Sequence, residues 1–315
     1  KVMRSGEMKK YKKIILAVVI SMMVSLLGSC KGNEQQVKNS IKIGYLPITH
    51  SLPLYVEKKV EKENIELVKF GSWPELMDAL NSGKIYGASV LIELAMKAKV
   101  QGIDLKAVAL GHSDENAVIV NEKIKNVKEL KGKTFAIPNK LSTHYILLYE
   151  MLKKENMSLK DINIVELPPS EMAVALLEKR IDGYCVAEPF GAKAVVNGNG
   201  KVLKQSSDII PNSICCALVF RGDFIKESDE KAKEIVEKYS AATEDLSNEK
   251  ERRTRAKEFL SIQDTVLSES LGWISYDKLK IEEEDYNRIS QYLKEMKLLD
   301  NTPTYDEFVD NSLLE

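Results

Sequence analysis

The sequence predicts an α/β protein built as two lobes around a cleft, on three observations. Short β-branched runs alternate with longer segments of helical periodicity from Ile41 onward, as in βαβ units with parallel strands. The chain has 315 residues, more than one hydrophobic core usually holds. The strand-like runs at 105–110 and 117–120 are too close for a crossover helix, so we expect the chain to pass there between lobes.

Ten apolar or β-branched runs are predicted as strands: 41–45, 65–70, 86–90, 105–110, 117–120, 134–137, 162–167, 184–187, 201–204 and 214–220. Helices are predicted between them. The segment 74–82 begins with a proline suited to a first helical turn, 143–155 is largely apolar, and 170–179 begins at Ser170, a good N-cap. Beyond Phe220, helical spacing of apolar residues and charge-rich stretches indicate further helices.

These elements predict a chain that crosses between lobes twice, since it returns near 211–214. Lobe 1 is then discontinuous, 41–114 plus 214–315, and lobe 2 is 115–213. Two crossings beside a cleft are the basis of hinged closure.

Composition excludes several classes of protein. With 46 Lys and Arg against 47 Asp and Glu and 44% hydrophobic residues, the chain is globular, and its near-neutral charge makes nucleic acid an unexpected partner. Three His and four Cys are too few for a disulfide-stapled miniprotein or zinc-ribbon array. Walker, HExxH, GxSxG and CxxC motifs are absent from the sequence, so we predict a protein that is not an enzyme.

The N-terminal segment 1–29 is predicted to be a signal peptide. Lysines precede the apolar run 14–28, which is too short to remain comfortably as a membrane span. Residues 27–30, Leu-Gly-Ser-Cys, are similar to a bacterial lipobox, so Cys30 is predicted to carry a lipid on the outer face of the cell membrane. Segment 30–40 is a polar tether. An uncleaved anchor or a plain secretory signal is the alternative.

Candidate binding residues lie in the loops that follow the strands, where α/β proteins gather their ligands. Every His of the chain falls in such a loop. The candidates are Thr49, His50, Trp73, His112, Ser142, Thr143 and His144.

Three of these residues, Ser142, Thr143 and His144, open a predicted helix. Its unpaired N–H groups, two hydroxyls and an imidazole form a cradle for a small anion, or Ser142 is an ordinary N-cap. Trp73 either floors a pocket or packs at a helix start.

Acidic and sulfur-bearing candidates follow the later strands. Glu188 ends an apolar strand before a proline, so it either caps a helix or faces the cleft and attracts a cation or metal. Cys185, Cys215 and Cys216 are interpreted as small buried hydrophobes rather than as a disulfide.

Six segments resemble, in family order, the solute-binding proteins of the nitrate/sulfonate/bicarbonate and taurine (NitT/TauT) ABC importers. They are 44–50 (GYLPITH), 72–74 (SWP), 105–110 (LKAVAL), 142–144 (STH), 168–172 (PPSEM) and 182–190 (DGYCVAEPF). The resemblance implies a type II periplasmic-binding-protein fold and a lipid-anchored protein. Such a protein captures a small solute of the nitrate, bicarbonate, sulfonate or taurine class and delivers it to a permease and its ATPase. Trp73 and His144 resemble pocket positions of the nitrate and bicarbonate branch.

The acid in this predicted pocket leaves other ligands open. Glu188 would repel a bare anion, so an anionic ligand would need a cation such as calcium bound beside it. No other cofactor is expected. A pyrimidine precursor of thiamine also suits an acid beside the rings of Trp73, Tyr184 and Phe190.

Two further classes are weaker alternatives. One is an enzyme on the same fold, a pyrimidine-precursor synthase or a dehydratase, which would need the thiols of Cys215 or Cys216 to face the cleft beside His144. The signal peptide argues against this class. The other is a ligand-sensing accessory lipoprotein.

Overall fold

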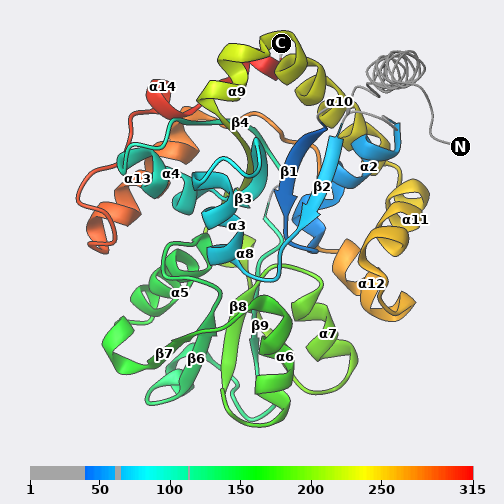
Figure 1. The fold of residues 1–315 in the computed structure, drawn as a ribbon. Helices are drawn as coiled ribbons and strands as arrows, with labels where there is room; N and C mark the ends of the chain where they lie inside the picture. The colour runs from blue at the N-terminus through cyan, green and yellow to red at the C-terminus, as the bar shows by residue number, and fades with distance from the viewer. Residues whose placement is uncertain (1–39, 61–64, 113, 315) are drawn as a thin grey trace, which may run out of the picture. The chain divides into compact units, whose positions relative to one another are not determined.

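Two five-stranded sheets organise the chain in a computed structural model that describes residues 40–60, 65–112 and 114–314 (Figure 1). The first sheet has the order β2-β1-β3-β10-β4, and the second has the order β7-β6-β8-β5-β9. The first contains β1 (Ile41–Tyr45), β2 (Ile65–Lys69), β3 (Gly87–Leu91), β4 (Leu105–Leu110) and β10 (Cys216–Arg221). The second contains β5 (Ala117–Val120), β6 (Thr134–Ile137), β7 (Asn163–Glu166), β8 (Gly183–Val186) and β9 (Lys201–Gln205). The predicted α/β class is confirmed.

Both sheets are mixed, which corrects the expectation of parallel strands. β1 pairs parallel with β2 and β3, and β6 pairs parallel with β7 and β8. β10 runs antiparallel to β3 and β4, and β5 runs antiparallel to β8 and β9. The two antiparallel strands are those that enter a sheet from the other one, without the crossover helix that a parallel neighbour requires.

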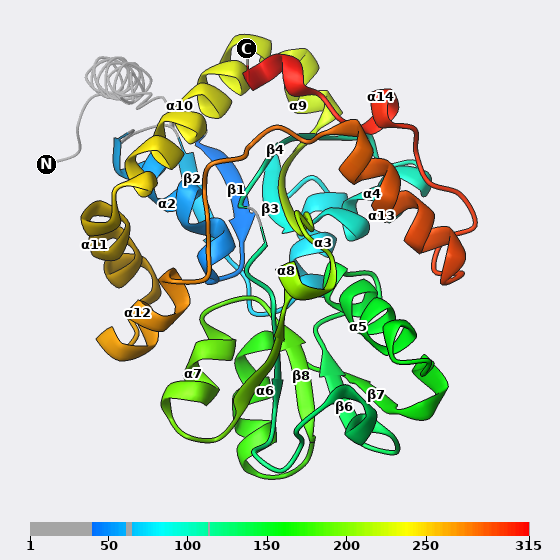
Figure 2. The same cartoon turned by 180° about the vertical axis from the view of Figure 1, so that it is seen from behind.

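Helices cover both sheets, as the two opposite views show (Figures 1 and 2). Those with the first sheet are α2 (Leu52–Val60), α3 (Trp73–Asn81), α4 (Ile92–Val100), α9 (Gly222–Glu227), α10 (Asp229–Ser247), α11 (Glu249–Leu260), α12 (Asp264–Leu271), α13 (Glu283–Glu295) and α14 (Tyr305–Phe308). Those with the second are α5 (Thr143–Lys154), α6 (Pro169–Leu177), α7 (Phe190–Val196) and α8 (Ser206–Ile209). The predicted start of α6 is wrong: the helix begins at Pro169 with Pro168 at the N-cap, so Ser170 lies inside the first turn.

The chain passes between the sheets twice, through residues 111–116 after β4 and through residues 210–215 before β10. We call the first sheet with its helices lobe 1 and the second with its helices lobe 2. Residues 41–315 form one compact unit, so the lobes are in contact. The predicted division into lobes at 114/115 and 213/214, and hinged motion there, stay predictions.

The predicted signal peptide, Cys30 and the tether up to residue 39 lie outside the described residues. In the segments that are described, no helix combines the length and the apolar character that a membrane crossing needs.

Gly87 is expected to be one of the least replaceable positions in the first sheet. A Cβ there would stand 2.4 Å from Cδ1 of Phe220 and 2.8 Å from the carbonyl oxygen of Val219. That oxygen belongs to β10, paired with β3, so it cannot withdraw without disturbing the sheet. Gly87→Ala is therefore expected to lower the free energy of unfolding by about 1–3 kcal/mol. Urea denaturation measures the effect. Gly71→Ala is the control, because its Cβ would meet only Glu75 Oε2, at 3.6 Å. Equal midpoints for the two variants would contradict the prediction.

Candidate functional site

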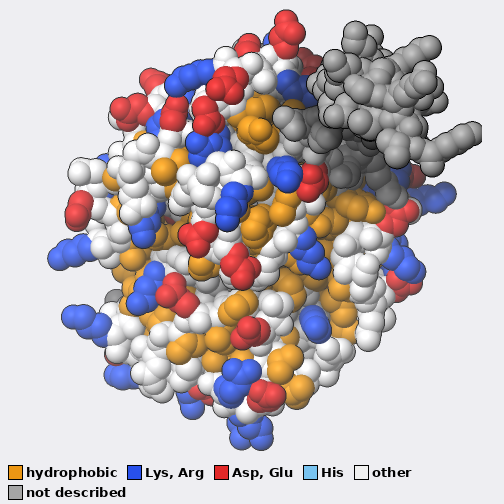
Figure 3. Space-filling model, viewed as in Figure 1, with side chains coloured by type: hydrophobic (Ala, Val, Ile, Leu, Met, Phe, Trp, Pro, Cys, Tyr) orange, Lys and Arg blue, Asp and Glu red, His pale blue; other side chains and the backbone are white. Residues whose placement is uncertain are grey.

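The residues His50 and His112 lie buried against each other at the first crossing. His50 is in a short 3₁₀ helix, η1 (Thr49–Ser51), after β1, and His112 follows β4. Their rings are stacked, with centroids 3.4 Å apart and planes inclined by 29°. Gly111 permits this approach, because a Cβ on it would stand 2.6 Å from the carbonyl oxygen of His50. Figure 3 accordingly shows mixed charges on the visible face and no exposed histidine.

Two thiols from the second crossing join the histidines. Cys216 opens β10, and its Sγ lies 3.4 Å from Nδ1 of His50 and 4.0 Å from Sγ of Cys215. One ligand atom from each of the four side chains lies within 4.8 Å of the others. The described cysteines are free and buried, as predicted. The interpretation of Cys215 and Cys216 as plain hydrophobes is incomplete, because both belong to this His/Cys cluster.

The carboxyl group of Glu115 lies beside the cluster. Its Oε1 is 2.9 Å from Oγ1 of Thr49, and its Oε2 is 3.3 Å from Nε2 of His50. Burial, with the nearby Glu188 carboxyl, raises the pKa of Glu115 well above its ordinary value. Burial, with the charges of His112 and His144, lowers the pKa of His50 well below 6.5. Both shifts favour the uncharged forms, so burial disfavours an ion pair between Glu115 and His50.

The Ser-Thr-His segment reaches the same region from lobe 2. Ser142 is the N-cap of α5, since its Oγ accepts from the N–H of Tyr145 at 3.3 Å. Oγ1 of Thr143 lies 2.5 Å from Oε1 of Glu93 in lobe 1. Burial raises the pKa of Glu93 to about 7. Protein groups thus already engage both hydroxyls of the predicted anion cradle.

His144 differs from these hydroxyls. Its side chain is 1% exposed, and neither ring nitrogen has a hydrogen-bond partner among the described residues. Burial, with the charge of His112, lowers its pKa to about 3. His144 is therefore a neutral, buried imidazole whose ring nitrogens are not used by other described residues.

Glu188 both caps a helix and joins the lobes. Its carboxylate accepts from the N–H of Ala192 at 2.9 Å, in α7, and from Oγ of Ser270 at 3.0 Å, in lobe 1. Its carbonyl oxygen accepts from the N–H of Thr49 at 3.0 Å. Burial raises the pKa of Glu188 to about 8. The capping interpretation is confirmed, and Glu188 is not in the cluster that could hold a metal ion.

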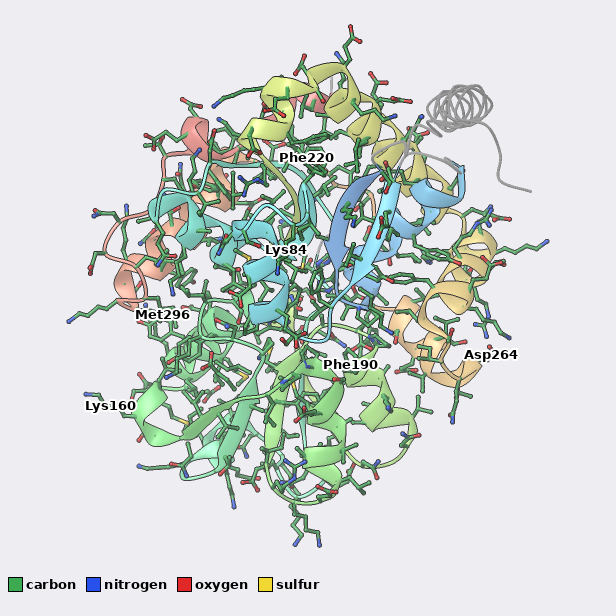
Figure 4. All side chains as sticks on the ribbon, in the orientation of Figure 1. Lys84, Lys160, Phe190, Phe220, Asp264 and Met296 are labelled. Atoms are coloured by element: carbon green, nitrogen blue, oxygen red, sulfur yellow. The ribbon has the colours of Figure 1, made fainter. Side chains whose placement is uncertain are left out.

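The two aromatic candidates have different environments. Trp73 opens α3, packs in the same apolar core as Cys215 and Cys216, and has a buried Nε1 without an acceptor among the described residues. Tyr184 lies in the separate apolar core of lobe 2, and its hydroxyl donates to the carbonyl oxygen of Phe190 at 2.8 Å. Figure 4 labels Phe190 where lobe 2 faces lobe 1. The structure therefore does not bring Tyr184 to the His/Cys cluster.

A groove of about 500 Å³ has Glu115 among its lining residues, although the side chain of Glu115 is fully buried. The groove is lined by residues of both crossings and of the 272–278 segment, among them Asp114, Asn212, Trp273 and Lys278. Since Glu115 also contacts His50, this groove lies next to the His/Cys cluster.

Two α/β lobes joined by two crossings, with buried polar groups from both lobes between them, define the class of periplasmic-binding-protein folds. A family model for the NMT1-like family matches residues 34–261, and the chain belongs to that family.

Solved structures and curated sequences agree with this family. The zinc-bound ligand-binding component of an ABC-type import system from Staphylococcus aureus is 42% identical, with a TM-score of 0.84 over 87% of this chain and 97% of that one. The periplasmic aliphatic sulphonate binding protein SsuA from Escherichia coli shares the fold, at 21% identity and a TM-score of 0.71 over 85% of this chain and 91% of that one. The nitrate import ATP-binding protein NrtC of Synechocystis is 27% identical over 59% of this chain.

The chain spans 32%, 64% and 63% of the length of three curated relatives. The predicted resemblance to the nitrate/sulfonate solute-binding proteins is confirmed, and the similar sulfonate- and nitrate-binding proteins are binding proteins rather than enzymes.

Proposed function

We propose that the chain is the extracytoplasmic binding component of an ABC importer. It captures a small solute between its lobes and delivers it to a permease driven by an ATPase. The observation that carries this proposal is the set of buried polar groups at the crossings, to which both lobes contribute. Closure over a solute would remove it from water, and contacts made only in the closed form would favour that form. The relatives named as importer components support the proposal.

The ligand class follows from the relatives and from the charge of the site. Nitrate, bicarbonate or a sulfonate is suggested by the names of the relatives, taurine by the sequence resemblance, and a thiamine pyrimidine precursor is the alternative. Burial raises the pKa values of Glu93, Glu115 and Glu188, so these groups oppose an anion less than ionised carboxylates would. Calcium bound beside an anionic ligand stays part of the proposal. The zinc in the Staphylococcus aureus relative adds a metal cation to the candidates.

The proposed ligand-binding side chains are those that face the crossings. They are Thr49, His50, Trp73, Ser142, Thr143, His144 and Glu188, with Tyr184 proposed as a support behind them.

Calorimetry on the full chain tests the binding role. The panel comprises nitrate, bicarbonate with and without calcium, alkanesulfonates, taurine, hydroxymethylpyrimidine and divalent metal ions. One ligand is expected to bind and to reduce the radius of gyration in small-angle scattering. Binding without any change in the dimensions of the protein would contradict closure of the lobes. Chemical conversion of the bound solute would contradict the proposal and favour the enzyme alternative.

Lipid anchoring is a separate part of the proposal, since the lipobox-like sequence lies outside the described residues. Cys30→Ser is expected to move the protein from the membrane fraction to the soluble fraction, because the sulfur that would carry the lipid is removed. Cys185→Ser is the control and should remain in the membrane fraction. Fractionation that Cys30→Ser leaves unchanged would argue against lipidation.

A further inference from the structure

The spacing within the His/Cys cluster is close to that of a tetrahedral metal site. With metal–sulfur bonds of about 2.3 Å and metal–nitrogen bonds of about 2.0 Å, the ligand atoms of such a site lie roughly 3.3–3.8 Å apart. The separation between Nδ1 of His50 and Sγ of Cys216 is 3.4 Å, and that between the two sulfurs is 4.0 Å. The four ligand atoms all lie within 4.8 Å of one another, and the stacked rings of His50 and His112 would have to rotate so that a nitrogen of each points at the same ion.

The ligand types select the class of ion. Calcium and magnesium take oxygen ligands, whereas two thiolates and two imidazoles suit zinc and its neighbours cobalt and nickel. Two thiolates also balance the charge of a divalent ion, so the buried site holds no uncompensated charge. Binding then releases up to two thiol protons to solvent.

The surroundings of His50 match those of a metal-bound imidazole. One ring nitrogen, Nδ1, faces the sulfur of Cys216, and the other, Nε2, faces the carboxyl group of Glu115 at 3.3 Å. A carboxyl group behind a coordinating histidine fixes the orientation of its ring. Thr49 holds this carboxyl group in turn, at 2.9 Å.

The cluster is closed to solvent. Glu115 is among the residues that line the groove beside the crossings, but its side chain is fully buried, as are those of His50 and His112. An ion would therefore reach the cluster only when the lobes separate.

The geometry points to His50, His112, Cys215 and Cys216 as the binding site for a divalent transition-metal ion of the zinc type, which is the cargo of the protein. These four side chains come from lobe 1 and the crossings, and His144 of lobe 2 is not among them. This inference rests on the proposed function and names its solute.

Cobalt titration of the full chain, purified in detergent and stripped with a chelator, tests the site. Bound Co²⁺ is expected to show thiolate-to-metal charge transfer and the visible bands of tetrahedral coordination, and Zn²⁺ should displace it. Cys216→Ala is expected to weaken binding about 100-fold and to reduce the charge-transfer absorption. Cys185→Ala is the matched control, because Cys185 is an equally buried thiol outside the cluster. Its spectrum and affinity should equal those of the native chain.

The outcomes separate the site from the wider role. Native-like cobalt spectra in Cys216→Ala, with circular dichroism confirming its fold, would overturn the metal site even if an organic solute bound and the importer role stood. A metal removed only by unfolding the chain would be structural and would overturn the cargo assignment. Reversible binding in a chain whose deletion leaves cellular zinc uptake unchanged would keep the site but refute the metal ion as the cargo.

Discussion

The native chain is expected to lose stability as pH rises from about 4.5 toward 8, and Glu188→Gln is expected to reduce that loss. Burial raises the pKa of Glu188 from an ordinary value of 4.5 to about 8, so the folded state binds a proton that the unfolded state releases. The stabilising contribution of this proton is fully present below 4.5 and is lost as pH rises through 8. Each pKa unit corresponds to about 1.4 kcal/mol, so the loss amounts to several kcal/mol.

Urea midpoints between pH 5 and pH 8 measure this effect. Glutamine keeps an oxygen that can accept from the N–H of Ala192 and an amide that can donate to Ser270, so the fold should survive. Glu93 and Glu115, whose pKa values burial raises, add to the loss of stability. His50 and His144, whose pKa values burial lowers, oppose it below about pH 6.5, so Glu188→Gln should remove only part of the slope and is compared with the native chain above that pH. Glu171→Gln, at an exposed position on α6, should leave the slope unchanged. A slope equally steep in Glu188→Gln would disprove the protonated, buried carboxyl group.

The arrangement of the strands could be predicted because it follows local rules. Runs of β-branched residues located the strands to within a residue or two, as in the predicted 65–70 against the observed Ile65–Lys69. The short link after β4 also predicted the crossing between sheets. The directions of β5 and β10 were not anticipated, because they depend on which sheet each strand joins rather than on its own sequence.

The His/Cys cluster could be predicted only in part. The histidines were candidates because they follow strands. The thiols of Cys215 and Cys216 are interpreted from the sequence as buried hydrophobes and considered beside His144 only for the enzyme alternative. Their place beside His50 could not be predicted, since Cys216 is 166 residues from His50 and only the insertion of β10 between β3 and β4 brings them together. Nothing local distinguishes these thiols from Cys185.

The alternation of side chains between the two faces of β8 explains why Tyr184 packs away from the His/Cys cluster. Neighbouring residues of a strand point to opposite faces. Cys185 accordingly packs in the core shared with Cys215 and Cys216, whereas Tyr184 and Val186 pack in the separate core of lobe 2. If Cys185 points toward the cleft, its neighbour Tyr184 must point away from it. Tyr184 therefore cannot also line a pocket in that cleft.

Thr49→Val is expected to weaken the contact between the lobes and to lower the free energy of unfolding by about 1–3 kcal/mol. Oγ1 of Thr49 lies 2.9 Å from both Oε1 of Glu115 and the carbonyl oxygen of Glu188, and the residue is fully buried. Valine keeps the volume but removes the hydroxyl. Glu188 still accepts from the N–H of residue 49, whereas Oε1 of Glu115 loses its hydrogen bond inside the protein. Thr49→Ser retains the hydroxyl and should recover most of the loss.

Because Glu115 also orients His50, Thr49→Val should weaken ligand binding at the crossings more than Thr49→Ser does. Equal unfolding midpoints and equal affinities in the two variants would show that the hydroxyl holds neither the lobes nor Glu115.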